Sequence, residues 1–218
     1  MTAFNPSGFV AALLAGWVLT ACGSPSGEVR SAPEPVREPH TAADARFMTH
    51  MIHHHAQALV MGGWAPAHDA SPTVQRLAER IVAGQLDEIA LMQRWLRDRR
   101  LPVPQVDSSG MVKGTAMDHS GGTDGAHHGQ EMAMPGMLTD AQLRQLDQAR
   151  GREFDRLFLT YMIQHHKGAV TMVRDLFGTP GAAQVESVFK LANDISADQT
   201  SEISRMQRML ATIEGSSP

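Results

Sequence analysis

The feature that most constrains this chain is a histidine-bearing motif that occurs twice. Residues 47–61 read FMTHMIHHHAQALVM, and residues 158–172 read FLTYMIQHHKGAVTM, at a constant offset of 111 positions. Phenylalanine, threonine, methionine, isoleucine, a His-His pair and alanine recur in register. Two copies of one motif predict two copies of one structural unit, so we expect an internal structural repeat.

Each copy places histidine on the apolar side of a predicted helix. Positions spaced alternately by four and three residues form a core-facing stripe, and they carry Phe, Met, His, Ala and Met in both copies. These residues are Phe47, Met51, His54, Ala58 and Met61 in the first copy and Phe158, Met162, His165, Ala169 and Met172 in the second. His55 and His166 fall on the neighbouring stripe, so both members of each pair should face the interior or its edge. His50 and His53 are not repeated and receive less weight.

The recurrence of the pair, with methionine one turn upstream, favours a metal site or a proton-linked site. Imidazoles and thioethers are ligands that soft or borderline metals prefer. The alternative is a pair of hydrogen-bonded core histidines, which is the commoner role of a single histidine on an apolar stripe. Repetition favours the functional interpretation without excluding the structural one.

A second repeated stripe predicts two partner helices. Its members are Ala78, Ile81, Gln85, Glu88, Met92 and Trp95, and, 114 positions later, Ala192, Ile195, Gln199, Glu202, Met206 and Met209. A carboxylate in a protein core is costly unless it is paired or bound to a metal. We therefore expect Glu88 and Glu202 to meet histidines on facing helices, either as metal ligands or as hydrogen-bond acceptors that orient the imidazoles. Met92 and Met206 are secondary candidates for the same site.

Capping and turn signals give the boundaries of four helices. Ser71-Pro72 is a strong helix start, and Thr139 opens a capping box. Gly62-Gly63 should end the first helix, and Gly151 should kink the third. The expected helices cover residues 44–61, 72–100, 140–177 and 183–213. Without strand-like alternation of useful length, this pattern predicts an all-α, ferritin-like four-helix bundle made of two repeated hairpins within residues 44–214.

A segment rich in methionine, histidine and glycine should join the two hairpins. Residues 103–138 have a composition that cannot bury enough surface to fold alone, so we expect a flexible link. Its candidate metal ligands are Met117, His119, His127, His128, Met132, Met134 and Met137. The segment is either a copper-scavenging tract or a biased linker without a role.

The N-terminal region has the pattern of an exported lipoprotein. Residues 1–21 resemble a signal peptide, and the run that ends Leu19-Thr20-Ala21-Cys22 resembles a bacterial lipobox. Cys22 would then be lipidated, residues 22–43 would form a disordered tether, and residues 215–218 would be a short tail. A plain signal peptide with an incidental cysteine is the alternative. As the single cysteine of the chain, Cys22 excludes an internal disulfide and a zinc site built on several cysteines.

The doubled motif also resembles a known family. Asp-x-x-Phe-x-x-x-Met-Ile-x-His-His occurs at residues 44–55 and 155–166, and it is similar to the pattern of the DUF305 family of exported bacterial proteins. The resemblance covers about residues 44–214 and implies a ferritin-like bundle. Some members of that family are periplasmic copper-binding proteins linked to copper resistance. The residues that the resemblance implies as metal ligands are Met51, His54, His55, Met162, His165 and His166.

These observations lead to one main functional hypothesis and two alternatives. The main one is a membrane-anchored extracytoplasmic protein that binds copper, as Cu(I) or Cu(II), for sequestration or delivery, with zinc as a second candidate metal. It could act with a second copy of itself or with a copper-handling protein. The first alternative is a non-catalytic envelope module in which histidine and glutamate only fix the packing register. The second is a di-metal oxidase, which is disfavoured because no Glu-x-x-His occurs.

Partners of other classes are not indicated by the composition. The net charge is −4 with histidine neutral, and no basic patch points to nucleic acid.

Overall fold

The structure is a computed structural model that describes residues 39–113 and 134–215. The predicted signal segment, Cys22 and five ligand candidates of the link lie outside these residues, so their predictions stay untested. The five are Met117, His119, His127, His128 and Met132.

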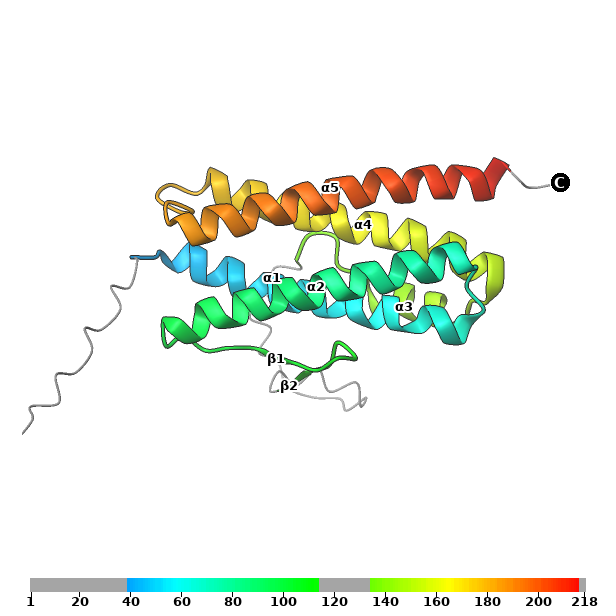
Figure 1. The fold of residues 1–218 in the computed structure, drawn as a ribbon, viewed down its shortest axis with the longest axis horizontal. Helices are drawn as coiled ribbons and strands as arrows, with labels where there is room; N and C mark the ends of the chain where they lie inside the picture. The colour runs from blue at the N-terminus through cyan, green and yellow to red at the C-terminus, as the bar shows by residue number, and fades with distance from the viewer. Residues whose placement is uncertain (1–38, 114–133, 216–218) are drawn as a thin grey trace, which may run out of the picture. The chain divides into compact units, whose positions relative to one another are not determined.

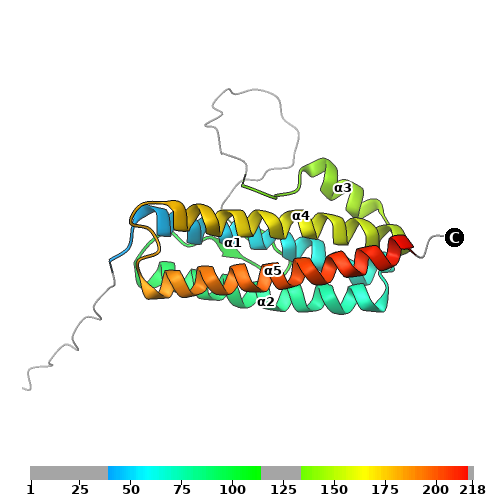
Figure 2. The same ribbon diagram turned by 90° about the horizontal axis from the view of Figure 1, so that it is seen from above.

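Four long helices form two antiparallel hairpins (Figure 1). The elements are α1 (Ala42–Trp64), the 3-10 turn η1 (Ala65–His68), α2 (Pro72–Asp98), β1 (Gln105–Val106), β2 (Val112–Lys113), α3 (Asp140–Gln148), α4 (Gly151–Gly178) and α5 (Glu186–Gly215). Helices α1 and α2 make one hairpin, α4 and α5 make the other, and α1 packs against α4. The predicted all-α bundle of two repeated hairpins is confirmed. Figure 2 shows α3 on the side of α4 that faces away from α2 and α5.

The helix starts follow the capping residues of the sequence. Thr41 accepts a hydrogen bond from the Asp44 backbone N–H while the Asp44 carboxylate accepts one from the Thr41 N–H, which forms a capping box. Thr139 and Gln142 repeat this arrangement at α3. At α2, Ser71 is the N-cap and proline fills the first helical position. The first helix therefore begins at Ala42, two residues earlier than the sequence predicted.

Two boundary predictions were wrong. Gly62-Gly63 does not end α1, because the helix continues to Trp64. A side chain at Gly62 would come within 2.6 Å of the Val82 side chain, so this glycine allows α2 to approach α1 closely. The expected single helix over 140–177 is two helices, because Ala149 and Arg150 are extended between α3 and α4.

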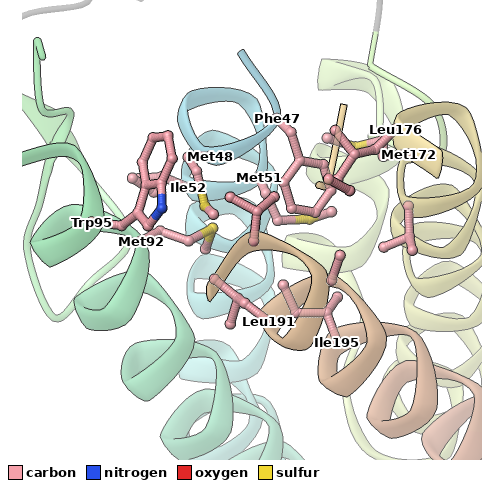
Figure 3. Packing of buried hydrophobic residues seen from close by; sticks show 14 of the residues in the cluster. Phe47, Met48, Met51, Ile52, Met92, Trp95, Met172, Leu176, Leu191 and Ile195 are labelled. Carbon is pink, nitrogen blue, oxygen red and sulfur yellow. The ribbon is translucent and has the colours of Figure 1, made fainter. Parts of the chain in front are cut away.

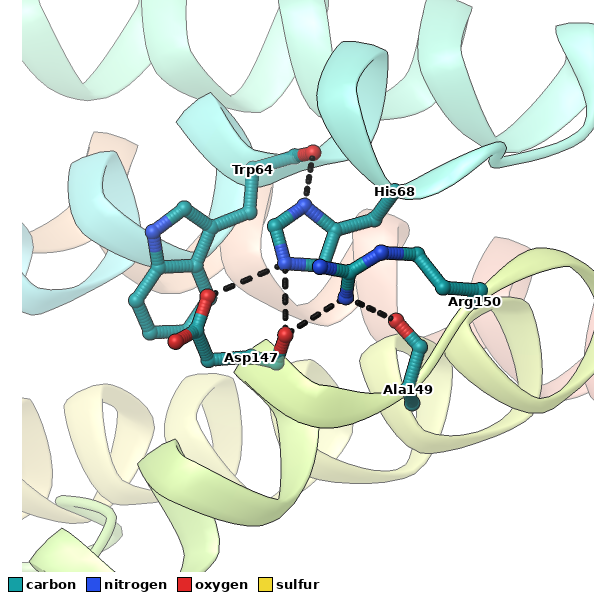
Figure 4. A network of polar contacts seen from close by, with 5 residues as sticks. All are labelled: Trp64, His68, Asp147, Ala149 and Arg150. Carbon is teal, nitrogen blue, oxygen red and sulfur yellow. Dashed lines mark hydrogen bonds and ion pairs between the residues drawn. The ribbon is translucent and has the colours of Figure 1, made fainter.

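A network around His68 holds the separate helix α3 against the bundle (Figure 4). The imidazole Nδ1 lies 2.8 Å from the Trp64 carbonyl oxygen, and Nε2 lies 2.8 Å from the Asp147 carbonyl oxygen and 3.0 Å from its carboxylate. Arg150 donates to the carbonyls of Asp147 and Ala149. Both nitrogens of the His68 ring therefore face oxygen acceptors, one on α1 and one on α3.

Two aspartates from the repeated motif tie the hairpins together reciprocally. Asp44 of α1 accepts a hydrogen bond of 2.7 Å from the backbone N–H of Ala183, which precedes α5. Asp155 of α4 accepts one of 3.1 Å from the backbone N–H of Ser71, which precedes α2. Each hairpin thus supplies the acceptor that fixes the loop of the other.

The interior consists of two apolar clusters. The first contains Phe47, Met51 and Ile52 of α1 with Met92 and Trp95 of α2, and Figure 3 shows these side chains packed with residues of α4 and α5. The second lies towards the α3 end, and its members include Ala58, Met61, Val74, Leu77, Ile81, Phe154, Phe158, Met162 and Met206. Full burial of one such side chain stabilises the fold by roughly 1.5–3 kcal/mol. Between the two clusters, every long helix contributes polar residues to one layer.

The sequence predicted that residues 103–138 form a flexible link, but the two described ends of this link, residues 103–113 and 134–138, are ordered. Strands β1 and β2 pair in a short antiparallel hairpin. A side chain at Gly110, in the turn of this hairpin, would collide with the Ala56 backbone oxygen, so the hairpin lies directly on α1. After the undescribed residues, Gln57 exchanges two hydrogen bonds with the Leu138 backbone, of 3.1 and 2.7 Å. Both ends of the link therefore pack against α1 next to its histidines.

Candidate metal centre

The two His-His pairs meet in the polar layer between the apolar clusters. His54 and His55 come from α1, His165 and His166 come from α4, and all four have no exposed surface. The rings of His54 and His165 are the closest, with centroids 3.8 Å apart and planes inclined by 36°. Antiparallel packing of the two repeats produces this convergence, because each pair lies near the middle of its helix. The structure thus brings together the four histidines that the sequence singled out.

Two of the four imidazoles are oriented by glutamates of the partner helices. His55 Nε2 lies 2.5 Å from a Glu88 carboxylate oxygen, and His166 Nε2 lies 2.7 Å from a Glu202 carboxylate oxygen. Only 14% and 20% of these two glutamate side chains are exposed. A carboxylate accepts, so Nε2 carries the proton in both histidines. Of the two roles expected for the glutamates, this geometry is that of a hydrogen-bond acceptor behind an imidazole.

The other two imidazoles donate to backbone carbonyls. His54 Nε2 lies 3.0 Å from the Pro135 oxygen, and His165 Nε2 lies 2.9 Å from the His54 oxygen. The halves differ here because Pro135 and Gly136 press against Gly168, where a side chain would collide with the Pro135 carbonyl. Gly168 takes the place that Gln57 has in the first repeat. The Pro135-Gly136 segment, at the end of the link, can therefore reach His54 from the α4 side.

All four imidazoles consequently present an unused nitrogen. When Nε2 donates from a neutral ring, Nδ1 keeps a lone pair and no proton. In the described part of the chain, Nδ1 of each of His54, His55, His165 and His166 is buried without a hydrogen-bond partner. A buried acceptor left unsatisfied costs about 1–3 kcal/mol. One layer of the core thus contains four nitrogen lone pairs that have no hydrogen-bond donor in the described residues and that a bound cation would satisfy.

Burial also keeps the central pair of imidazoles neutral. Desolvation, followed by repulsion from His55, lowers the pKa of His54 from 6.5 to about 3, although the Pro135 bond opposes the change. Desolvation, followed by repulsion from His54, lowers the pKa of His165 well below its ordinary value. Imidazole must be neutral to bind a metal. Both residues therefore keep their lone pairs available at neutral pH.

The predicted methionines flank the layer on both sides. Met51 and Met92 belong to the first apolar cluster, whereas Met162 and Met206 belong to the second. All four are completely buried. Residues three positions apart on a helix are neighbours, so Met51 adjoins His54 and Met162 adjoins His165. Of the link methionines that the structure describes, Met134 packs against the first cluster and Met137 is half-buried.

Nitrogen and oxygen side chains alone do not form a ready site. Within residues 39–113 and 134–215, no group of three or more histidine, cysteine, aspartate or glutamate side chains is arranged to hold a metal ion. An ion bound to the central imidazoles would need further donors, and the adjoining thioethers are of the type that Cu(I) accepts. The donor set therefore fits a soft ion better than a hard divalent cation.

An acidic groove between α2 and α5 lies over the same layer. Its volume is about 350 Å³, and its charged lining residues are Arg80, Asp87, Glu88, Asp198 and Glu202. Gln85 and Gln199 also line it. Partial desolvation raises the pKa of the exposed Asp198, and the carboxylates of Glu88 and Glu202 raise it further.

Apart from Glu88 and Glu202, sequence reasoning did not assign the lining residues of this groove to the site, and it did not assign the Pro135 carbonyl. The recurrence of glutamine at positions 85 and 199 was the available signal for the groove. Nothing in the repeat itself indicated that Pro135 would reach His54, because the link has no repeated counterpart.

Comparison with known proteins identifies a family named for a domain of unknown function, DUF305. The DUF305 family model matches residues 44–210. No curated protein matches the chain. Among the described residues, none of the helices is long and apolar enough to span a membrane.

Solved structures share this fold. A DUF305 protein of Streptomyces coelicolor, inferred to be secreted, is 28% identical with a TM-score of 0.62, over 79% of this chain and 94% of the other. A DUF305 fragment of Deinococcus radiodurans is 27% identical with a TM-score of 0.61, over 80% and 99%. CopM in its Cu(II)-bound form is 29% identical with a TM-score of 0.56, over 78% and 96%. CopM structures with Cu(I), with silver and without metal are similar to this chain as well.

Proposed function

The chain belongs to the DUF305 family, and we propose that it is an exported copper-binding protein whose metal lies in the layer of four buried histidines. The observation that carries this proposal is the set of four buried Nδ1 lone pairs without hydrogen-bond partners among the described residues. Each Nε2 is held by an oxygen acceptor, and this is the arrangement that fixes the tautomer of a metal-binding histidine.

The central ligands in this proposal are His54 and His165, completed by the thioethers of Met51 and Met162. His55 and His166 stand one residue further on and provide a second pair of imidazoles. Imidazole suits both oxidation states of copper, and thioether favours Cu(I). The similarity to CopM, which was solved with Cu(I), Cu(II) and silver, supports copper over zinc.

The protein's contribution would be to bind and shield the ion rather than to use it in catalysis. Glu88 and Glu202 hold the outer imidazoles, and the two apolar clusters exclude water on both sides of the layer. A site of this kind suits sequestration or delivery of copper.

A copper titration of paired variants tests the proposal. We expect the wild-type chain to bind Cu(I) tightly and the double variant His54→Ala, His165→Ala to lose that binding. His68→Gln is the matched control, because His68 is also buried yet has acceptors at both nitrogens. Equal Cu(I) affinity of the double variant and the wild type would refute the site.

The same titration should include a variant that tests whether the link binds copper. Replacing Met117, His119, His127, His128 and Met132 with serine removes five of the seven ligand candidates of the link while the chain length stays the same. Deleting the whole link would also remove the Pro135 acceptor of His54, so substitution is the cleaner experiment. Tight binding that survives the serine variant supports the bundle site, and binding that disappears moves the site to the link.

We also propose that Cys22 anchors the exported protein to a membrane by lipidation. The lipobox-like sequence supports this, and the Streptomyces relative inferred to be secreted agrees with export. Stable anchoring takes more than one acyl chain. Cys22→Ala should move the protein from the membrane fraction to the soluble extracytoplasmic fraction, and an unchanged distribution would count against the anchor.

A further inference from the structure

Two surface hollows are lined in part by residues that bond the histidines of the layer, and the charges of the two linings are opposite. The groove between α2 and α5 is lined by the carboxylates of Asp87, Glu88, Asp198 and Glu202 against one cation, Arg80. The other hollow, of about 660 Å³, lies over α4 and α5 beside Pro135 and Gly136. Lys167 is the charged residue of its lining. A metal cation is therefore attracted to the first opening and repelled from the second.

The second opening is also closed at its inner wall. Pro135 and Gly136 pack so tightly on Gly168 that a side chain at position 168 would collide with the Pro135 carbonyl. The same carbonyl accepts the His54 bond. An ion entering on this side would have to displace the backbone that holds His54. On the α2–α5 side, the histidines are bonded to the side chains of Glu88 and Glu202.

Buried amides connect the acidic groove with the interior. Gln85 and Gln199 line the groove, and each has only 2% of its surface exposed. In the described part of the protein, neither polar atom of the Gln85 side chain has a hydrogen-bond partner, nor does the side-chain oxygen of Gln199. Amides buried in this state are costly, and amide oxygens are ligands for cations.

The two glutamates occupy the boundary between groove and layer. One carboxylate oxygen of Glu88 accepts from His55, and one of Glu202 accepts from His166, while both side chains keep some exposure to the groove. A cation in the groove thus meets the carboxylate oxygens of Glu88 and Glu202 first. The imidazoles of His55 and His166, to which these carboxylates are bonded, lie behind them.

We propose that the α2–α5 groove is the route by which a metal cation enters and leaves the histidine layer, and that the side-chain oxygens of Gln85 and Gln199 bind the ion in transit. This inference rests on the proposed copper site. It assigns a role to Asp87 and Asp198, which line the groove but are neither proposed copper ligands nor acceptors of a histidine hydrogen bond. Surface carboxylates of this kind raise the rate of cation arrival through their field.

The charge of the groove is tested by binding kinetics of Cu(II) with the full chain. The double variant Asp87→Asn, Asp198→Asn should slow association roughly tenfold at low ionic strength, with the difference vanishing at high salt. The control, Asp98→Asn, Asp175→Asn, removes the same charge from exposed positions outside the groove. Association rates that are equal in the two double variants at every salt concentration would overturn the route.

The transit role of the amides has a different kinetic signature. Gln85→Leu, Gln199→Leu keeps the side-chain size and removes the oxygens, and it should slow binding and release by the same factor, about tenfold. The dissociation constant should then stay unchanged, because a group used only in passage does not stabilise the final complex. A weaker equilibrium affinity with an unchanged association rate would show that these amides are final ligands and would refute the transit role.

The failure of the route can be separated from the failure of the site. If copper binding does not depend on His54 and His165, both proposals fall together. If binding depends on those histidines but the groove variants bind and release copper at wild-type rates, only the route is wrong.

Discussion

His68 and the histidines of the central layer are buried to nearly the same degree but are used differently. His68 is 4% exposed, and both of its nitrogens face oxygen acceptors that lock α3 to the end of the bundle. Each histidine of the layer has one nitrogen bonded and the other without a partner among the described residues. The comparison teaches that burial alone does not mark a functional histidine; an unsatisfied lone pair on a fixed tautomer does.

The largest expected effect is the stabilisation of the layer by metal. Cu(I) at about 1,000 times its dissociation constant should raise the free energy of unfolding by about 4 kcal/mol. Thermal unfolding with and without Cu(I) measures this, and Ag(I) serves as a redox-inert substitute. His68→Gln should keep the full increase, and His54→Ala, His165→Ala should show none. An increase retained in the double variant would break the distinction between the two regions.

The next effect concerns the carboxylates behind the outer imidazoles. Replacing both Glu88 and Glu202 with glutamine leaves an acceptor for each Nε2 proton but weakens the polarisation of the ring. We expect copper affinity to fall by roughly 10- to 100-fold, the usual result of disturbing the hydrogen-bond partner of a ligand. Asp147→Asn is the corresponding change at His68 and should leave copper affinity unaltered. Competition titration with a copper chelator gives the numbers.

Acid should distinguish the regions in the metal-free protein. The folded pKa of His54 is lowered to about 3, and that of His165 is lowered as well, so these residues stay neutral while the unfolded chain takes up protons below about pH 6.5. Their contribution to stability is complete above pH 6.5 and is lost as the pH falls. Between pH 6.5 and 4.5 the loss is about 2 kcal/mol for His54 alone.

Denaturant unfolding at several pH values checks this sign. His54→Gln, His165→Gln should flatten the acid branch of the stability curve relative to the wild type. His68→Gln should leave the acid branch in place. A curve that is equally steep in the layer variant would mean that the central imidazoles are protonated in the folded state.

The smallest effect is structural and belongs to His68 itself. Removing its bonds to Trp64 and Asp147 with His68→Gln should cost about 1–2 kcal/mol, since each of the two intramolecular hydrogen bonds contributes about 0.5–1 kcal/mol net. Hydrogen exchange should localise the loss to α3, because α3 depends on this contact. Loss of protection at α1 or α4 instead would place His68 in the central layer's network.

The bundle itself could be read from the sequence because its signals are local. Thr139 with Gln142 and Ser71 with Pro72 start helices by satisfying their own first turns, and the structure confirms both starts. Gly62 misled the prediction because its role is tertiary: it makes room for Val82 rather than ending α1. The separation of α3 from α4 was missed for a similar reason, since its stabilising partner, His68, lies far away in the sequence.

The histidines of the layer could be found from the sequence, whereas their hydrogen-bond roles could not. The repeat placed four imidazoles on apolar stripes, and antiparallel packing of identical units brings such positions together. Which nitrogen is bonded depends on Pro135, in a segment without a repeated counterpart, and on which glutamate meets which histidine. The acidic groove could not be predicted from the repeat either, because the position equivalent to Asp198 in the first repeat is Gly84.

The reciprocal bonds from Asp44 to Ala183 and from Asp155 to Ser71 make the two hairpins complementary fragments. Each hairpin contains a carboxylate that accepts from the loop of the other hairpin, and a loop whose backbone N–H is bonded from outside. A chain cleaved once between residues 113 and 134 should therefore migrate as a single particle, with its halves held by the shared interior and these two bonds. Separately produced halves should likewise reassemble when mixed, and the complete set of proposed copper ligands would meet only in the reassembled pair.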